Sequence, residues 1–145
     1  MKIVIINGPN LNLLGKREPA IYGTRSMEQV LVDIQRTLPN LHLHYLQSNH
    51  EGQLIDWIQM FGAGNIEGEK IMGIILNAGG YTHTSIAIGD AVACAEVPVV
   101  EVHISDISKR EEFRHISLLT DVCAHSIIGH GTNGYLEAVE WVVNS

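Results

Sequence analysis

A chain of 145 residues with 46% hydrophobic residues has room for one domain with a buried core and no room for a second. Its formal net charge of −7 argues against nucleic acid and anionic membranes as partners, since both require basic stripes. No apolar run approaches the roughly 18 residues of a membrane span, and the start lacks the apolar core of a signal peptide. We therefore expect a single cytoplasmic domain over residues 1–145, in which a few local arginines hold any anionic ligand.

Strand and helix patterns alternate along the chain. Short apolar or alternating runs predict strands at residues 3–6, 41–47, 71–76, 99–103 and 126–129. Helices are predicted over residues 26–38 with a capping box of Ser26 and Gln29, after a cap at Ser48-Asn49, over 86–95, and after 132–134. This alternation predicts an α/β fold, a flavodoxin-like doubly wound sheet of five parallel strands in the order 2-1-3-4-5.

Polar residues follow four of the predicted strands. These segments are residues 7–12, 77–83, 101–105 and 130–131. In doubly wound sheets, ligands bind beyond the carboxyl ends of the strands, at the switch point beside the first strand. We therefore expect all four segments to meet in one crevice.

Glu101 and His103 are the first candidates for chemistry in that crevice. They are two residues apart on a predicted strand, so their side chains lie on the same face. A buried carboxylate holds an imidazole in one tautomer and favours its charged form, which suits general acid catalysis. The alternative is a structural hydrogen-bonded pair within the sheet.

Tyr22 is the second candidate, on a loop that is longer than the roughly 2–6 residues of an ordinary strand-to-helix connection. A free phenol loses its proton only near pH ~10, but a guanidinium within ~4–6 Å favours the phenolate. Arg17 and Arg25 flank Tyr22 in the sequence and could supply that charge. The alternative is a tyrosine that packs against the domain or closes over a ligand.

Three further patterns have both a functional and a plain structural interpretation. His42 and His44 share one face of a predicted edge strand, where a solvated surface is favoured over a metal pair. Residues 129–134 fit the G-x-G-x-x-G spacing but lack the following strand and the acidic residue about 20 positions on, so they predict a tight turn. Arg110 and Arg114 are four apart and could share a helical face that contacts a carboxylate or hydroxyls, or belong to a surface charge cluster.

Four segments carry a resemblance to a known family. GPNLNLLGKREPAIYG, NAGGYTHTS, VEVHISDISKREEFR and GHGTNGY occur in the family's order and cover most of the chain. Together they resemble type II 3-dehydroquinate dehydratase, the small dehydroquinase of the shikimate and quinate pathways. The resemblance implies the flavodoxin-like fold and dehydration of 3-dehydroquinate, a small carboxylate, to 3-dehydroshikimate with no metal and no organic cofactor.

The resemblance also implies roles for individual residues. Tyr22 matches the base that removes a proton from C2, and Arg17 matches the arginine on the same mobile loop that favours its phenolate. Asn12 matches the residue that positions a water against the developing enolate. His103, steered by Glu101, matches the acid that protonates the departing C1 hydroxyl.

Substrate binding is implied at a second set of positions. Asn77, His83 and Arg114 match residues that contact the ring hydroxyls. Ile104, through its backbone, and Ser105 match the site for the substrate carboxylate.

Assembly and two departures complete the resemblance. Asp90 matches an acidic residue that reaches a neighbouring subunit's site, and the family forms homo-oligomers, dodecamers built as four trimers. Asp106 stands where the family commonly has asparagine and adds negative charge near the anion site, and Gly89 stands where an arginine is often found. Arg110 matches a motif arginine without a defined role.

Three other interpretations fit the sequence less well. A receiver-type signalling module would have an acidic pair after the first predicted strand, and this chain has none there. A flavin- or nucleotide-binding module would require a Ser/Thr-Gly phosphate loop or a P-loop, and neither is present. A Schiff-base dehydroquinase would require a buried lysine, yet Lys70 is the only lysine in the middle of the chain and lies in a charged segment.

Overall fold

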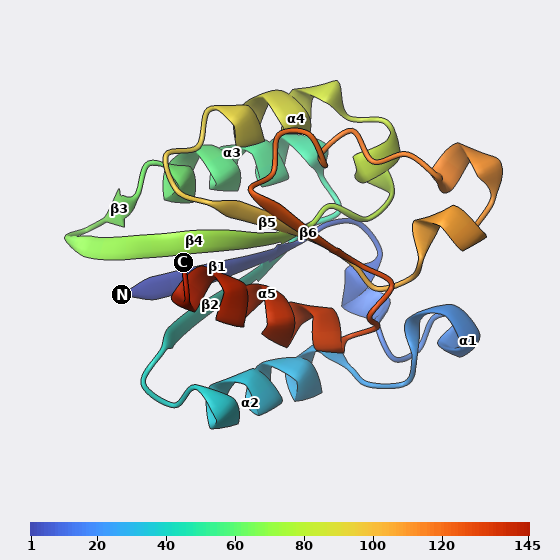
Figure 1. Ribbon diagram of the computed structural model, residues 1–145, viewed down its shortest axis with the longest axis horizontal. Coiled ribbons are helices and arrows are strands. Elements are labelled where there is room, and N and C mark those ends of the chain that lie inside the picture. The colour runs from blue at the N-terminus through green and yellow to red at the C-terminus, as the bar shows by residue number, and fades with distance from the viewer.

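The computed structural model describes residues 1–145 as a parallel sheet between two layers of helices (Figure 1). The main strands are β1 (Lys2–Asn7), β2 (His42–Gln47), β4 (Glu69–Asn77), β5 (Val99–His103) and β6 (His125–Ile128). They lie in the order β2-β1-β4-β5-β6 with every neighbouring pair parallel, which confirms the predicted fold and strand order. A sixth strand, β3 (Asn65–Ile66), pairs antiparallel with β4 and was not predicted, because two residues carry no periodicity.

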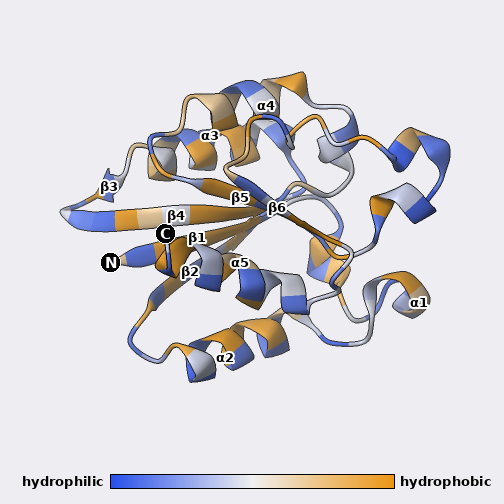
Figure 2. Ribbon diagram, in the orientation of Figure 1, coloured by the Kyte–Doolittle hydropathy of each residue, from blue (hydrophilic) through white to orange (hydrophobic).

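Helices α2 (Met27–Thr37) and α5 (Asn133–Val143) cover one face of the sheet, and α3 (Glu51–Gly62) and α4 (Ile86–Ala93) cover the other (Figure 1). Successive β1 residues point to opposite faces, so the sheet contributes to two apolar cores, one under each helix pair. Figure 2 shows the central strands as largely apolar between helices of mixed hydropathy. Polar side chains of the central strands are therefore concentrated at the strand ends.

The start of α2 follows the sequence prediction, whereas the start of α3 does not. Ser26 Oγ accepts a hydrogen bond from Gln29 N at 3.2 Å, and Ser26 N donates to Gln29 Oε1 at 2.9 Å, so the predicted capping box is confirmed. The predicted cap at Ser48-Asn49 is wrong, because α3 begins at Glu51. Ser48 Oγ instead accepts from His50 N at 3.0 Å and closes a turn before the helix.

A long loop, residues 8–25, leaves β1 beside the exit of β4. Gly8 N donates to Asn77 O at 2.7 Å, and a Cβ at Gly8 would lie 2.5 Å from Ala78 O, so only glycine fits. The loop contains the 3₁₀ turn η1 (Leu11–Leu13) and the short helix α1 (Pro19–Tyr22). It ends at Arg25, which pairs with Asp33 of α2 and donates to Thr132 Oγ1 at 3.0 Å, just before α5. The loop is thus anchored at both ends.

The two histidines of β2 lie at different depths. His42 is exposed, and its Nδ1 lies 2.8 Å from Glu69 Oε2 at the start of β4. His44 is half-buried against Phe61, and burial together with the charge of Lys2 lowers the pKa of His44. The chain has no cluster of three or more His, Cys, Asp and Glu side chains able to hold a metal ion. None of its helices combines the length and apolar character that crossing a membrane requires.

Candidate active site

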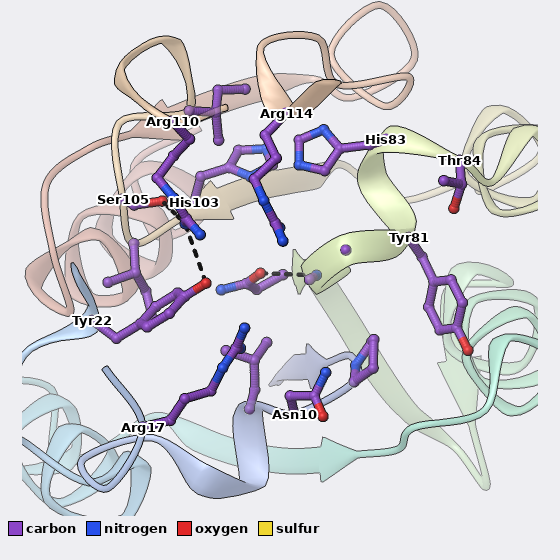
Figure 3. A pocket seen from close by; sticks show the side chains of 17 residues that line it. Asn10, Arg17, Tyr22, Tyr81, His83, Thr84, His103, Ser105, Arg110 and Arg114 are labelled. Atoms are coloured by element: carbon purple, nitrogen blue, oxygen red, sulfur yellow. Dashed lines mark hydrogen bonds between the residues drawn. The ribbon is translucent and has the colours of Figure 1, made fainter. Parts of the chain in front are cut away.

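A cavity of about 360 Å³ lies at the carboxyl edge of the sheet, beyond β1, β4 and β5 (Figure 3). Its walls are the long loop, the 3₁₀ turn η2 (Gly79–His83) after β4, and the segment after β5 with the turns η3 (Ile107–Lys109) and η4 (Glu112–Arg114). The sequence-predicted site residues that line it are Arg17, Tyr22, Asn77, His83, His103, Ile104, Ser105 and Arg114.

The other predicted residues lie outside this lining. Glu101 is fully buried behind His103, and Asp90 is exposed on α4. Asn12 is exposed, with its Oδ1 3.5 Å from Gln47 Nε2, and Asn10 reaches the cavity in its place. The expectation that all four polar segments meet in one crevice is wrong for the last one, because His130 Nδ1 lies 2.7 Å from Glu137 Oε2 on α5, away from the cavity.

Glu101 is held as an anion at the end of β5. Its carboxylate lies 2.8 Å from His103 Nε2 and accepts hydrogen bonds from the hydroxyls of Ser126 at 2.7 Å, Ser117 at 2.8 Å and Thr120. Burial by itself raises the pKa of Glu101, but the bonds from His103, Ser126 and Thr120 outweigh it and bring that pKa to about 2. The carboxylate is therefore charged at neutral pH.

The charge on Glu101 fixes the tautomer of His103. An ionised carboxylate only accepts hydrogen bonds, so the Nε2 of His103 must carry a proton. The second ring nitrogen, Nδ1, has no hydrogen-bond partner in the protein, and His103 lines the cavity. When the imidazole is charged, Nδ1 can deliver a proton to a bound molecule and return to the neutral form.

Tyr22 lies at the end of α1, with arginines from two segments around it (Figure 3). Arg110 Nη1 donates to Tyr22 Oη and to Ser105 Oγ, both at 3.2 Å. Arg17 lies over the ring face, with its Cζ 4.8 Å from the ring centroid. Partial burial disfavours the charged guanidinium of Arg110, but the hydrogen bond and the charge of Tyr22 raise the pKa of Arg110 overall.

The sequence analysis placed one arginine wrongly and left another without a role. Arg25 is the nearer neighbour of Tyr22 in the chain, yet it turns away to contact Asp33 and Thr132, so its predicted place beside the phenol is wrong. Arg110, for which the sequence offered no defined role, donates the hydrogen bond to the phenol oxygen. Arg110 and Arg114 do not share a helical face, the first of the two possibilities considered for them, because Arg110 follows the turn η3 and Arg114 ends the separate turn η4; both side chains line the cavity.

The remaining wall offers neutral and cationic hydrogen-bond donors. His83 Nδ1 lies 2.8 Å from Ile116 O; because a carbonyl only accepts, this nitrogen carries a proton, and Nε2 is the ring nitrogen left for a ligand. Arg114 Nε lies 3.0 Å from Glu111 Oε2, and its guanidinium points into the cavity beside His83 (Figure 3). The cavity therefore combines a phenol beside two arginines, a carboxylate-backed imidazole and further hydrogen-bonding groups, a set suited to moving protons on an anionic molecule.

Comparison with known proteins agrees with this chemistry. The sequence model of the family described as "Dehydroquinase class II" matches residues 1–143. The chain belongs to the class II dehydroquinase family. It is therefore an enzyme of the dehydratase type.

Individual relatives match along their whole length. The 3-dehydroquinate dehydratase of Halothermothrix orenii is 49% identical over 145 residues, covering 99% of this chain and 94% of the relative. That of Prochlorococcus marinus is 48% identical over 147 residues, covering 99% and 97%. The type II dehydroquinase structure from Butyrivibrio crossotus has a TM-score of 0.88 at 45% identity, covering 100% of this chain and 98% of that chain. The type II dehydroquinase structure from Propionibacterium acnes has a TM-score of 0.89 at 33% identity, covering 99% of this chain and 97% of that chain.

The two departures from the dehydroquinase pattern lie outside the cavity lining. Asp106 accepts from Ser108 N at 3.0 Å and from Ser108 Oγ at 2.6 Å, and these bonds lower the pKa of Asp106. The Asp106 carboxylate therefore caps η3, and it does not belong to the cavity wall where the sequence analysis expected the anion site. Gly89 is buried on α4, where an added Cβ would be in ordinary contact with Leu118 O at 3.6 Å.

Proposed function

We propose that this dehydroquinase converts 3-dehydroquinate to 3-dehydroshikimate and water through an enolate, with Tyr22 as base and His103 as acid. The observation that supports this best is the pairing of two proton carriers in one cavity: a phenol hydrogen-bonded to Arg110 and an imidazole backed by an anionic carboxylate. No electron transfer is involved, because the reaction only removes a proton from C2 and a hydroxide from C1.

The first step is proton abstraction by Tyr22. The hydrogen bond from Arg110 and the cation of Arg17 over the ring both stabilise the phenolate relative to the phenol. The phenolate takes the C2 proton, and the electron pair moves onto the ketone oxygen to form the enolate. The positive charges around the cavity stabilise this new anion where it develops, which is commonly the largest catalytic contribution.

The second step is loss of the C1 hydroxyl. The enolate electrons return to form the C1–C2 double bond, and the leaving oxygen takes a proton from Nδ1 of charged His103. The permanent negative charge of Glu101 stabilises the imidazolium before this transfer and keeps Nε2 protonated after it. The base and the acid thus act in separate steps.

Asn12 remains our proposal for the residue that positions a water against the enolate oxygen. Its side chain lies outside the cavity, whereas that of Asn10 on the same loop lines it. The role of Asn12 therefore requires residues 8–25 to shift when substrate binds. The exposed side chains along this loop leave room for such a shift.

Substrate recognition is proposed to divide between two walls. Ser105 Oγ and the backbone of Ile104 hold the substrate carboxylate close to the Arg110 guanidinium, which already bonds Ser105. Asn77, His83 and Arg114 contact the ring hydroxyls from the other wall.

We also propose that the chain assembles as a homo-oligomer, a dodecamer of four trimers, in which Asp90 reaches a neighbouring site. Large apolar side chains lie exposed near Asp90 and the cavity: Ile86 is 70% exposed, and Phe113 and Ile116 are each 72% exposed. A second copy of the chain would remove this apolar surface from water. Light scattering on the purified protein should give the mass of twelve chains, and a monomer mass would contradict the assembly.

The activity is tested directly by the ultraviolet absorbance of the conjugated product. Purified protein and 3-dehydroquinate should produce this absorbance after removal of metal with a chelator. Borohydride added with substrate should leave the activity intact, because the enolate route forms no imine. Inactivation by borohydride would reject this route in favour of a Schiff base, and absence of product would reject the function.

A further inference from the structure

A chain of hydrogen bonds runs from the cavity wall into the core on the α5 face of the sheet. Gly79 N donates to Asn77 Oδ1 at 3.1 Å, and Asn77 Nδ2 donates to Tyr135 Oη at 3.0 Å. Tyr135 Oη donates to Asn7 Oδ1 at 2.8 Å, and Asn7 Nδ2 donates to Tyr45 Oη at 3.3 Å. Asn7 and Tyr135 are 0% exposed and Asn77 is 4% exposed, so water does not compete for the two bonds that join these three side chains.

The direction of every bond in this chain follows from its first donor. A backbone N–H can only donate, so Gly79 fixes the oxygen of the Asn77 amide and turns its nitrogen toward Tyr135. Tyr135 Oη must then accept from Asn77 and use its own hydrogen on Asn7. If the Asn77 amide were flipped, its nitrogen would face the N–H of Gly79, and its oxygen would compete with Asn7 for the single hydroxyl hydrogen of Tyr135.

We propose that Tyr135 is a positioning residue that locks the amide of Asn77 in one orientation for the substrate. Asn77 lines the cavity, and after its bond to Tyr135 one hydrogen of its Nδ2 group remains without a protein partner. That hydrogen is available to a ring hydroxyl of the substrate. This inference rests on the proposed function, in which Asn77 contacts those hydroxyls, and it adds that the contact depends on a phenol that never touches the substrate.

The packing of α5 explains why a phenol reaches this point. A Cβ at Gly134 would lie 3.3 Å from both Ile127 Cγ2 and Val102 Cγ1, so glycine lets the start of α5 approach the sheet closely. This close approach places the next residue, Tyr135, fully inside the core beneath the cavity. Burial raises the pKa of Tyr135, so its hydroxyl stays protonated and remains a donor to Asn7 throughout the working pH range.

The test is Tyr135→Phe, which keeps the ring and removes only the hydroxyl. The Asn77 amide then keeps only the bond from Gly79 N to its oxygen and loses the partner of its nitrogen, so it is held less firmly. KM for 3-dehydroquinate should therefore rise about tenfold while kcat changes far less. The matched control is Tyr45→Phe, which removes the other tyrosine hydroxyl in this series of hydrogen bonds; Tyr45 bonds Asn7 and does not bond Asn77. This control should keep the KM of the parent protein.

A double variant separates positioning from general damage. In an Asn77→Ala background, Tyr135→Phe should cause no further rise in KM, because its target amide is already absent. An equal rise in both backgrounds, or a parent-like KM for Tyr135→Phe alone, would overturn the proposal. If Tyr135→Phe does not fold, the parent protein can be examined by nuclear magnetic resonance. The side-chain amide of Asn77 should then give one set of signals, with one amide proton close to the Tyr135 ring. Two exchanging sets of signals would refute the proposal. A parent protein without turnover would instead refute the proposed function.

Discussion

His103 lies at the end of a central strand with 6% of its side chain exposed, whereas Tyr22 lies on a loop whose neighbours Glu18, Pro19 and Ala20 are all exposed. The proposed acid, His103, is fixed by a sheet register and by hydroxyls packed around Glu101. The proposed base, Tyr22, depends on an arginine from a different loop for the only hydrogen bond of its side chain. The cavity thus joins a proposed acid held in the sheet to a proposed base held on an exposed loop, and the two can be disrupted separately.

The largest loss of activity is expected when Tyr22, on the exposed loop, loses its hydroxyl. Tyr22→Phe should lower kcat by about 10⁴-fold, because no other group is placed to take the C2 proton, while substrate binding is retained. Product absorbance and calorimetric binding measure the two effects. Tyr81→Phe is the matched control, since Tyr81 also lines the cavity but donates to the backbone oxygen of Asn49 at 2.8 Å. Substantial activity in Tyr22→Phe would remove the phenolate from the mechanism.

Removing the imidazole of His103 should block only the second proposed step, the loss of the C1 hydroxyl. His103→Ala should lower dehydration by about 10³-fold, yet Tyr22 should still exchange the C2 hydrogen of the substrate with solvent. Incubation in deuterated water followed by mass spectrometry detects this exchange. If exchange and dehydration disappear together while binding persists, the separation into two steps is wrong.

Arginine substitutions should distinguish contact with the phenol oxygen from contact with the ring. Arg110→Gln should lower kcat by about 10²-fold because it removes the charged donor at the oxygen. Arg17→Gln should cost about tenfold, because its cation lies over the ring face. Arg25→Gln should leave kcat unchanged, since Arg25 faces Asp33. A larger loss for Arg17→Gln than for Arg110→Gln would reverse the assignment.

The last effect concerns stability, not turnover, and belongs to Glu101 alone. The pKa of Glu101 is lowered from 4.5 to about 2 in the folded chain, so between these values the unfolded chain binds more protons. Stability supplied by the charged carboxylate is therefore complete above pH ~4.5 and is lost as the pH falls toward ~2, by about 3 kcal/mol in all. Urea unfolding of the parent and of Glu101→Gln at several pH values should show the parent losing this advantage. A constant difference would contradict it.

The sequence predicted best what depends on residues close in the chain. Glu101 and His103 are two residues apart, and the strand period alone places them on one face. Ser26 and Gln29 are three apart, and their capping box followed from local helix chemistry. The strand order was also predicted, because alternation of strands and helices leaves few topologies.

Contacts between distant segments could not be predicted in this way. Arg110 and Tyr22 are 88 residues apart, and their meeting depends on how two loops pack above the sheet. Sequence proximity instead favoured Arg25, which the packing of α2 and α5 draws away. Asn10 lines the cavity, whereas Asn12 does not. This placement depends on a left-handed backbone at Asn10, with φ 69°, which no periodicity reveals.

The anchoring of residues 8–25 at both ends has a consequence for the integrity of the enzyme. Gly8 is fixed against Ala78, and Arg25 is fixed to α2 and the start of α5, so neither end relies on the stretch between them. A protease that cleaves near Pro19 would leave two fragments still held together by the sheet. The nicked protein would melt almost like the intact one and be catalytically silent, so a thermal-shift screen alone would not detect the damage.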